Sequence, residues 1–470
     1  MLKFIDYSYE NLKDYAPYIA RCTYLCADFS LGSVFMWHER VNMQFAIYHN
    51  TFVMKLDMGD EPAFSYPIGE DVEGALDALE ELVKVENWPL MFFGINEEIL
   101  QQIKNSKRFD TVSENFERKW SDYLYNYEEM LLFSGKKFSG QRNHINRFVK
   151  TYGVPDFRPI EPENVPEIKK MLEEYGLNHG DGALEKMELQ GTYELLRCFK
   201  ELKMYGGALY VDGKVAGFTI GELVGDMLVI HVEKALTTYT GVYPTLFNSF
   251  MKYLKEQENT NIRLVNREDD SGDAGLRTSK MQYKPVRLLH KYLVKINSPV
   301  CKINEIPKIS FAGGILNEIS EEDKSAYLDL NIDKENNIYW GYDYEEDSGI
   351  TEVDENTFYD MQLHDYVLGA SVNFAVREEA GGELIGETIV YHFTVNGYAE
   401  IGGRIAKAHQ GKGLGTKSFA ATADFAKNVL GVKPIAKCYK QNKASYGMIT
   451  GAGFEKCGED ETFYHFEYVK

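Results

Sequence analysis

Residues 410–415, Gln-Gly-Lys-Gly-Leu-Gly, decide the fold expected for the C-terminal third of this chain. A strand-like run precedes them at 398–406 (YAEIGGRIA), and apolar residues then recur on one helical face that ends at Gly431. Three glycines at such a junction let the backbone turn sharply and bring several N–H groups to the positive end of the helix dipole. The stretch therefore predicts a turn that binds a pyrophosphate.

The position of this turn in the chain distinguishes between two kinds of nucleotide-binding fold. A dinucleotide-binding fold carries its glycines after the first strand of a unit, with an acidic residue about 20 positions further on. Here the turn comes late, and a strand at 433–438, Asn442, a short helix and the pair Gly453-Phe454 follow it. This order resembles the GNAT superfamily of acyl-CoA-dependent N-acetyltransferases over about residues 314–470. The resemblance implies acetyl-CoA as the cofactor.

The composition fits a large enzyme with a negatively charged surface. The 470 residues carry a net charge of −21 and are 44% hydrophobic, which is enough for two or three cores. Nucleic acid or an anionic bilayer as the main partner would favour a basic chain, although a local basic groove stays an open alternative. The sequence shows neither a long apolar run nor a signal-peptide core, so we expect a cytoplasmic protein.

Cysteines and acidic clusters allow two further expectations. The six cysteines are scattered and lack paired zinc-ligand spacing, which predicts reduced thiols and no metal site. The motif His231-Val-Glu233 is similar to half of a deaminase zinc signature, but the Pro-Cys-x-x-Cys half does not follow. Acidic clusters at 343–347 and 352–355 are interpreted either as solvated surface or as an attraction for a cationic amine.

The clearest break in the pattern lies between Lys295 and Gly314, where prolines interrupt the periodicity. A basic amphipathic stretch at 136–152 is interpreted as a solvated helix face. We expect an α+β chain of three GNAT-like domains with mixed central sheets flanked by helices. The predicted division is a degenerate GNAT-like domain at 1–130, a second GNAT-like domain at 131–298, a linker at 299–313 and an acetyltransferase domain at 314–470.

A faint internal repeat relates the middle of the chain to its end. Residues 213–222 align with 382–390, and the next strand, 227–235, aligns with 398–406 at a nearly constant offset. The turn in the middle copy, 239–244, has one glycine and a proline that lacks an N–H donor. We therefore predict a GNAT-like fold there without coenzyme A binding by this route, with chance similarity of hairpins as the alternative.

The first 300 residues carry a second resemblance. Residues 266–280 (NREDDSGDAGLRTSK), 142–148 (RNHINRF), 231–235 (HVEKA) and 118–123 (RKWSDY) are similar to the phosphatidylglycerol lysyltransferase C-terminal family, over about residues 29–294. In that family the module consists of two fused GNAT-like folds, and known members move an aminoacyl group from tRNA to a lipid head group.

The resemblance implies a set of site residues in this module. Arg277 and Lys280 are then expected to face the tRNA end or a lipid phosphate. A structural role for the motif, as a helix cap with a buried ion-pair network, is the alternative. The candidate residues of the N-terminal module are Arg142, His231, Glu233, Asn266, Arg277 and Lys280.

The GNAT resemblance also assigns chemistry in the last domain. Glu400 lies ten residues before Gln410, where many GNAT enzymes carry a general base. Partial desolvation between splayed strands predicts a raised pKa for this carboxyl group, suited to accepting a proton from an amine. The alternative is a strand glutamate that pairs with Arg404 or faces solvent.

The general acid is expected on the helix after Asn442. The family's tyrosine position holds Ile449 here, so Tyr446, one turn earlier, is the candidate, with Tyr391, Tyr439 or water as alternatives. Asn442 is expected to hydrogen-bond the pantetheine arm or to cap its own helix. A bulge near residues 405–407 is expected to free N–H donors for the thioester carbonyl. The predicted cofactor-binding residues are Ile405, Ala406, Gln410, Gly411, Lys412, Gly413, Leu414, Gly415, Thr416, Asn442 and Ser445.

Aromatic and acidic residues at 337–343, 361–366 and 463–468 are expected to form the acceptor site. The leading hypothesis is an acyltransferase that moves an acetyl group from acetyl-CoA to a primary amine of a small molecule or peptide. The alternative is a tRNA-dependent aminoacyl transferase in residues 1–300, with the C-terminal domain as an accessory or an acetyl-CoA sensor. The sequence names neither the acceptor nor the oligomeric state.

Overall fold

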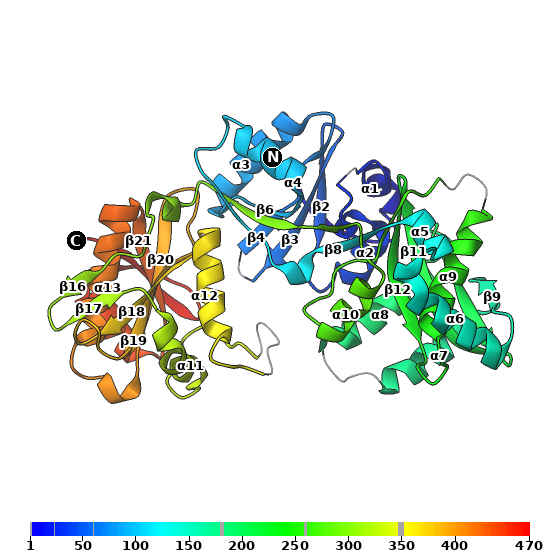
Figure 1. The fold of residues 1–470 in the computed structure, drawn as a ribbon. Helices are drawn as coiled ribbons and strands as arrows, with labels where there is room; N and C mark the ends of the chain where they lie inside the picture. The colour runs from blue at the N-terminus through cyan, green and yellow to red at the C-terminus, as the bar shows by residue number, and fades with distance from the viewer. Residues whose placement is uncertain (1, 23, 60, 179–182, 258–260, 346–351) are drawn as a thin grey trace.

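The computed structural model describes residues 2–22, 24–59, 61–178, 183–257, 261–345 and 352–470. Its strands form three mixed sheets, each with helices packed against it, which confirms the expected α+β class (Figure 1). The unit around the first sheet lies between the other two, so the chain passes through the middle of the molecule first (Figure 1).

The first sheet has the strand order β1-β2-β3-β4-β6-β15-β7, with β5 beside β3. Strands β4 and β6 are parallel, and α3 connects them. The elements of this unit are β1 (Ile5–Asp6), α1 (Leu12–Ile19), η1 (Ala27–Phe29), α2 (Leu31–Trp37), β2 (Gln44–Tyr48), β3 (Thr51–Met58), β4 (Glu61–Phe64), β5 (Ile68–Gly69), α3 (Val72–Glu86), β6 (Met91–Ile95), α4 (Glu97–Asn105), β7 (Val112–Asn115) and β15 (Tyr292–Ile296).

The second sheet has the order β14-β8-β13-β12-β11-β10-β9, with β12 and β13 parallel. Its unit contains η2 (Arg118–Trp120), β8 (Asp122–Asn126), α5 (Tyr127–Leu132), η3 (Lys136–Phe138), α6 (Ser139–Tyr152), β9 (Asp156–Pro159), α7 (Val165–Asn178), α8 (Ala183–Arg197), β10 (Tyr205–Val211), β11 (Lys214–Val224), β12 (Met227–Ala235), α9 (Val242–Lys255), β13 (Leu264–Asn266), α10 (Ala274–Gln282) and β14 (Arg287–Leu289).

The third sheet has the order β16-β17-β18-β19-β20-β21-β23-β22, with β20 and β21 parallel. Its unit contains η4 (Pro299–Lys302), β16 (Ile309–Phe311), β17 (Gly314–Asn317), η5 (Glu321–Asp323), α11 (Lys324–Ile332), α12 (Thr357–Leu368), β18 (Val372–Arg377), β19 (Gly386–Tyr391), β20 (Tyr398–Ile405), η6 (Lys407–His409), α13 (Leu414–Phe425), η7 (Ala426–Leu430), β21 (Lys433–Tyr439), α14 (Lys443–Gly451), β22 (Phe454–Glu459) and β23 (Phe463–Tyr468).

The first two units exchange strands. β8, at residues 122–126, pairs with β13 and β14 of the second sheet, and β15, at 292–296, pairs with β6 and β7 of the first. One continuous apolar core joins the two units, whereas the third unit has its own. The first two units therefore form one module, and the expected domain boundary at residue 130 stays a prediction.

Side chains of β20 point alternately to the two faces of the third sheet, and the two faces have different surroundings. Ala399, Ile401 and Ile405 are buried in the core against α13. Successive strand residues point to opposite faces, so Glu400 and its alternate neighbours project from the other side of the sheet. We call this side the open face and define it by Tyr398, Glu400, Gly402 and Arg404.

Hydrogen bonds and a buried apolar residue hold the third unit against the first. The Asn115 amide contacts His364 Nδ1 of α12 at 2.8 Å, and Ser298 Oγ donates to the Gly369 carbonyl at 2.6 Å. Leu368 of α12 is buried within the core of the first two units. These contacts fix where the open face lies relative to the first unit.

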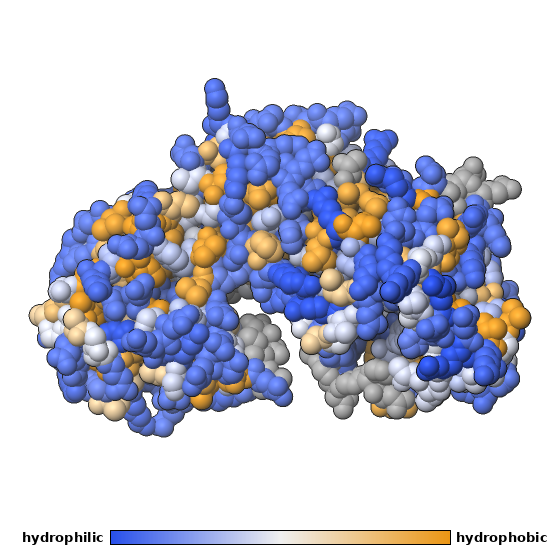
Figure 2. Space-filling view, viewed as in Figure 1, coloured by the Kyte–Doolittle hydropathy of each residue, from blue (hydrophilic) through white to orange (hydrophobic). Residues whose placement is uncertain are grey.

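The outer surface on the viewed side is mainly hydrophilic, with apolar residues in small groups (Figure 2). Every helix in the described parts of the chain is too short or too polar to cross a bilayer. Across the same residues, His, Cys, Asp and Glu side chains form no cluster of three that could hold a metal ion.

Candidate functional site

Two parallel strands separate at Glu400. β20 and β21 are paired only where Tyr398–Glu400 meets Lys433–Ile435. Beyond that point β20 runs on to Ile405 and β21 to Tyr439 without pairing to each other. The edge of β20 that faces the gap therefore keeps backbone groups that a bound chain-like ligand can hydrogen-bond.

The turn that enters α13 is open. Gly411 and Gly413 have φ of 79° and 73°, and a Cβ at either position would meet no atom within 4 Å among the described residues. Gly413 is the N-cap of α13 and caps it with no side chain. The first N–H groups of a helix lack internal partners, and the dipole favours an anion there. This end of α13 fits a pyrophosphate.

Residues of the turn contact neighbouring parts of the third unit. Gln410 Nε2 donates to the Ile405 carbonyl and to Asn336 Oδ1, each at 2.8 Å. Lys412 Nζ pairs with Glu378 Oε1 at 2.8 Å on the surface. Gly415 is close to its neighbours, since a Cβ would lie 3.2 Å from Met448 Sδ. Leu414 is buried, and Thr416 is half-buried behind the turn.

Ile405 and Ala406 lie where the turn leaves β20, but the expected bulge is wrong. The register between β19 and β20 runs from Gly386↔Ile405 to Tyr391↔Glu400 without a shift. The Ala406 N–H is bonded to the Ile385 carbonyl at 2.8 Å. Because hydrogen-bonded and non-bonded pairs alternate, the Ile405 N–H points away from β19 towards the gap. Strand separation, and not a bulge, frees the donors.

Glu400 is 7% exposed and has three polar neighbours. Tyr391 donates its hydroxyl to Glu400 Oε1 at 2.6 Å, while His392 Nδ1 and Lys437 Nζ lie 3.4 and 3.3 Å from Oε2. Burial alone would raise the pKa of this carboxyl group, but the contacts with His392, Lys437 and Tyr391 outweigh it and lower the pKa. The expected raised pKa is therefore wrong.

Arg404 is not the partner of Glu400. Its guanidinium donates to Glu387 Oε2 at 2.7 and 3.2 Å, and lies 4.1 Å from the centre of the Trp340 ring. Arg404 also donates to Asn337 Oδ1 and Asn331 Oδ1. This buried network holds Trp340 against the open face, where a Cβ on Gly402 would lie 3.6 Å from the indole.

The tyrosines considered as acids lie in different places. Tyr446 is 38% exposed on α14, with its ring edge-on to Tyr464 and Phe466 of β23. Tyr391 is bonded to Glu400, and Tyr439 packs between Tyr339 and Phe463. At the expected family position, Ile449 is 1% exposed and belongs to the core.

The helix after β21 begins at a side-chain cap. Asn442 Oδ1 accepts the Ser445 N–H at 3.0 Å, so Asn442 caps α14 in this structure. Its own amide N–H groups are not used by that bond, and a second role at a pantetheine arm is compatible with the cap. Asn442 and Ser445 thus stay predicted cofactor-binding residues.

The segments that were expected to form the acceptor site together lie in two different places. Tyr339 and Trp340, and Phe463 with Tyr439, gather on the open face. Residues 361–366 lie instead on α12, which packs on β18 and on β7 of the first unit. Of the acidic cluster at 343–347, residues 346 and 347 lie outside the described residues.

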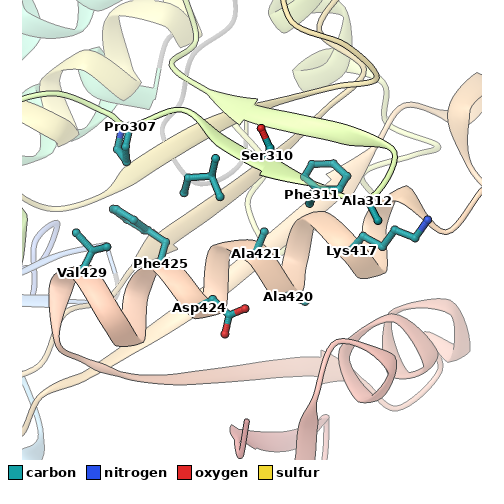
Figure 3. A pocket seen from close by; sticks show the side chains of 11 residues that line it. Pro307, Ser310, Phe311, Ala312, Lys417, Ala420, Ala421, Asp424, Phe425 and Val429 are labelled. Carbon is teal, nitrogen blue, oxygen red and sulfur yellow. The ribbon is translucent and has the colours of Figure 1, made fainter.

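A shallow groove of about 530 Å³ follows α13 on the other side of the sheet from Glu400 (Figure 3). Figure 3 shows Lys417, Ala421 and Phe425 of α13 facing Phe311 and its neighbours at β16. The groove is separated from the open face by the sheet itself, so we assign it no part in the candidate site.

Four of the six candidate residues in the second unit meet in its interior. Glu233 Oε1 accepts Arg267 Nη2 at 2.9 Å, and the guanidinium lies 4.7 and 4.6 Å from the ring centres of Phe247 and Tyr283. Asn266 donates to Asp122 Oδ2 at 2.8 Å. His231 and Lys280 complete this buried group.

His231 is the extra residue of a β-bulge, because Ile220 pairs with Val232 and Gly221 with Ile230. Its ring nitrogens lie 2.7 Å from Glu268 Oε1 and 3.0 Å from Glu222 Oε1. Burial alone would lower the pKa of this imidazole, but the two carboxylates raise it to about 9. His231 is therefore a buried cation at neutral pH.

The basic residues of the motif make internal contacts. Lys280 is 7% exposed and donates to the Arg267 carbonyl at 2.6 Å, an inward orientation that differs from the one the resemblance implied. Arg277 forms two bonds of 2.9 Å with Asp270 at the rim. Arg142 donates to the Gly135 carbonyl at 2.7 Å and holds the turn after α5.

Sequence reasoning missed several charged residues of both sites. Lys291 lies within 3.2 Å of carboxylate oxygens of Asp28, Asp122 and Asp269, at the junction of the first two units. The available signal was Lys291, the one residue of fixed charge in the largely apolar run 288–294 (LLHKYLV). For Lys437 beside Glu400 no such signal exists, because the contact depends on strand register.

Two family models match this chain. The model for the phosphatidylglycerol lysyltransferase C-terminal domain matches residues 25–295, and that for the GNAT acetyltransferase domain matches residues 315–455. An uncharacterized protein of Mycoplasmoides gallisepticum is 28% identical over 180 residues, which is 37% of this chain. The match spans 56% of the length of that relative.

Two solved structures are similar to more than half of this chain. A conserved protein of unknown function from Bacteroides thetaiotaomicron is 27% identical with a TM-score of 0.58, and the match covers 63% of this chain and all of that one. The C-terminal domain of a putative lysylphosphatidylglycerol synthetase from Agrobacterium fabrum is 16% identical with a TM-score of 0.45, and the match covers 61% of this chain and 92% of that one.

Proposed function

Because the chain belongs to the phosphatidylglycerol lysyltransferase C-terminal family and carries a GNAT acetyltransferase domain behind it, we propose that this last domain transfers an acetyl group from acetyl-CoA to a primary amine. Acyl transfer with an acyl-CoA is the activity of the GNAT domain in general. The acetyl group and the amine of a small molecule or peptide are the specific part of the proposal.

One observation carries the proposal. An uncapped helix end, with open glycines at 411 and 413, lies next to a strand gap that begins at a buried carboxylate. The N–H groups at the start of α13 would hold the pyrophosphate, and the free edge of β20 would hold the pantetheine arm. Acetyl-CoA would supply an activated acyl group as its thioester.

The side chains around the gap have proton-handling roles in this proposal. The lowered pKa of Glu400 keeps it ionised at neutral pH, so its carboxylate can accept a proton from the amine, directly or through water, as a weaker base than a carboxylate of raised pKa. Tyr391 holds the other carboxylate oxygen in place. Tyr446, half-exposed on α14, is assigned as the donor of a proton to the departing sulfur.

The test compares the full chain with its Glu400→Gln variant, by release of free coenzyme A thiol in the presence of an amine panel. A positioned general base is worth about 100-fold or more, so we expect turnover to fall by about that factor with the dissociation constant for acetyl-CoA unchanged. The control is Glu383→Gln, an exposed carboxylate between β18 and β19. An unchanged rate in Glu400→Gln would exclude Glu400 as the base.

A second candidate function is aminoacyl transfer from aminoacyl-tRNA in residues 1–300, with the last domain as an accessory or an acetyl-CoA sensor. The observation that favours it is a group of buried polar atoms without hydrogen-bond partners among the described residues: Thr219 Oγ1, Glu233 Oε2 and Arg267 Nη1. Buried polar groups usually have partners, and this second function assigns a ligand to these three atoms. The test incubates the full chain with aminoacyl-tRNA and phosphatidylglycerol vesicles. We expect the aminoacyl group to move to the lipid head group with release of free tRNA, and Glu233→Gln to lose this transfer; no transfer would exclude this function.

A further inference from the structure

A pocket of about 240 Å³ lies on the open face, where the third unit meets the first. β20, β21 and β23 form its floor, with Glu400 and Lys437 among the lining side chains. Asn87, which ends α3 in the first unit, forms a wall. The pocket therefore contains the proposed base and is completed by a residue of the other module.

The wall is fixed by hydrogen bonds between the two units. Asn396, in the turn between β19 and β20, donates to Asn87 Oδ1 at 3.0 Å and to the Lys84 carbonyl at 2.8 Å. The Val395 N–H donates to the Trp88 carbonyl at 3.2 Å. Asn87 has φ of 57°, which its short polar side chain tolerates. These hydrogen bonds hold the wall against the floor.

Acidic residues lie in one row across the sheet, from Glu400 and Glu467 in the pocket to Glu455 beyond it on β22. Glu400 pairs with Ile435, Ile435 with Glu467, and Glu467 with Glu455, so the four lie side by side. Two strand spacings put Glu467 about 10 Å from Glu400 between Cα atoms. Lys437 balances Glu400, whereas Glu467 and Glu455 are exposed and have no ion-pair partner in the described structure.

Like charges directly opposite each other on neighbouring strands are destabilising, and a bound cation relieves them. We propose that this pocket between the units is the acceptor site, and that it takes a small diamine, with one amine at Glu400 and the second, cationic group at Glu467. The inference rests on the proposed acyl transfer. The pocket is smaller than those that hold drug-sized ligands, which fits an acceptor of this size.

The first test measures binding without turnover. The full chain, saturated with coenzyme A, is titrated with 1,4-diaminobutane and with 1-aminobutane by calorimetry. We expect the diamine to bind about fivefold more tightly, the gain from one solvent-exposed ion pair, and Glu467→Gln to remove this difference. Glu461→Gln, in the exposed turn between β22 and β23, should keep it.

The outcomes separate the two proposals. Equal affinities for the two amines in the unaltered chain, no binding of either, or a preference that survives Glu467→Gln would overturn the diamine site. Tighter binding of the diamine without any acetyl transfer from acetyl-CoA would leave the pocket standing and refute the proposed function instead.

A second variant tests the contribution of the first unit. Asn87→Gly keeps the positive φ without strain and removes the side chain that forms the wall. We expect weaker diamine binding with the dissociation constant for coenzyme A unchanged. Unaltered diamine affinity in a folded Asn87→Gly chain would show that the first unit has no part in the site.

Discussion

The turns at Gly241 and Gly413 have the same place in the fold and opposite surroundings. Each follows a strand, β12 or β20, and starts a helix that returns to a parallel strand. At Gly413 a Cβ would meet nothing within 4 Å, whereas at Gly241 it would lie 2.3 Å from the His144 carbonyl oxygen of α6. Helix α6 therefore covers in the second unit the surface that is open in the third.

The strand gaps differ in the same way. Beyond Val229 the gap between β12 and β13 is filled by the buried pair Glu233–Arg267 and by His231. Beyond Glu400, β20 and β21 are no longer paired, and we propose that a ligand fills this gap. In the first unit, Asp71 caps the N-terminus of α3 by accepting the Gly74 N–H, so a carboxylate already takes the anion position. Of the three related helix ends, only that of α13 is free.

The largest expected effect comes from closing the open turn. In Gly413→Val a β-branched residue would be forced to a positive φ, and its side chain would project from the turn that carries the free N–H groups. We expect acetyl-CoA binding, measured by calorimetry on the full chain, to become undetectable.

The matched substitution in the covered turn should affect stability and not acetyl-CoA binding. Gly241→Val collides with the His144 carbonyl, so it should lower the melting temperature while acetyl-CoA affinity stays unchanged. Loss of binding in Gly241→Val, or its retention in Gly413→Val, would reverse the assignment of the two turns.

The next effect concerns the filled gap. Arg267→Met leaves Glu233 buried without its cationic partner, and breaking a buried ion pair in this way costs about 3–5 kcal/mol. Denaturant unfolding of the N-terminal module should report that loss. Acetyl-CoA binding by the folded chain should not change, and a stability equal to that of the unaltered chain would show that the pair is not structural.

A smaller effect on the free energy of unfolding is expected when the pH is changed. The pKa of His231 is raised to about 9, so its contribution to stability is complete below the unfolded value near 6.5 and is lost as pH rises through 9. Between pH 6 and 8 the loss should be about 2 kcal/mol. Lys280, whose pKa burial lowers to about 8, acts in the opposite direction above that pH.

The measurement for this prediction is the free energy of unfolding at pH 6, 7 and 8, in the unaltered chain and in His231→Gln. The variant should lose the decline with pH, because its side chain cannot titrate. A parallel decline in both proteins would assign the pH dependence to another group.

Local patterns in the sequence predicted the elements around the open turn. The strand at 398–406, the turn, the helix ending at Gly431 and the cap at Asn442 all appear, because each depends on neighbours a few residues away. The turn at 239–244 was predicted to be unsuited to pyrophosphate from its own residues, for the same reason. What covers it, helix α6, comes from about 100 residues earlier and was interpreted only as a solvated face.

Properties set by distant residues were missed. The pKa of Glu400 is lowered by Lys437 on a neighbouring strand and by His392, and strand order alone does not reveal these contacts. The exchange of β8 and β15 between the first two sheets is likewise a matter of long-range pairing. The contribution of Asn87 to the pocket at Glu400 depends on how two separate units dock.

The central claim is that one of three related helix ends, that of α13, binds the cofactor. The most direct test is the stoichiometry of acetyl-CoA binding to the full, unaltered chain by calorimetry. We predict one molecule per chain. Two or more molecules per chain, or no binding at all, would contradict the account.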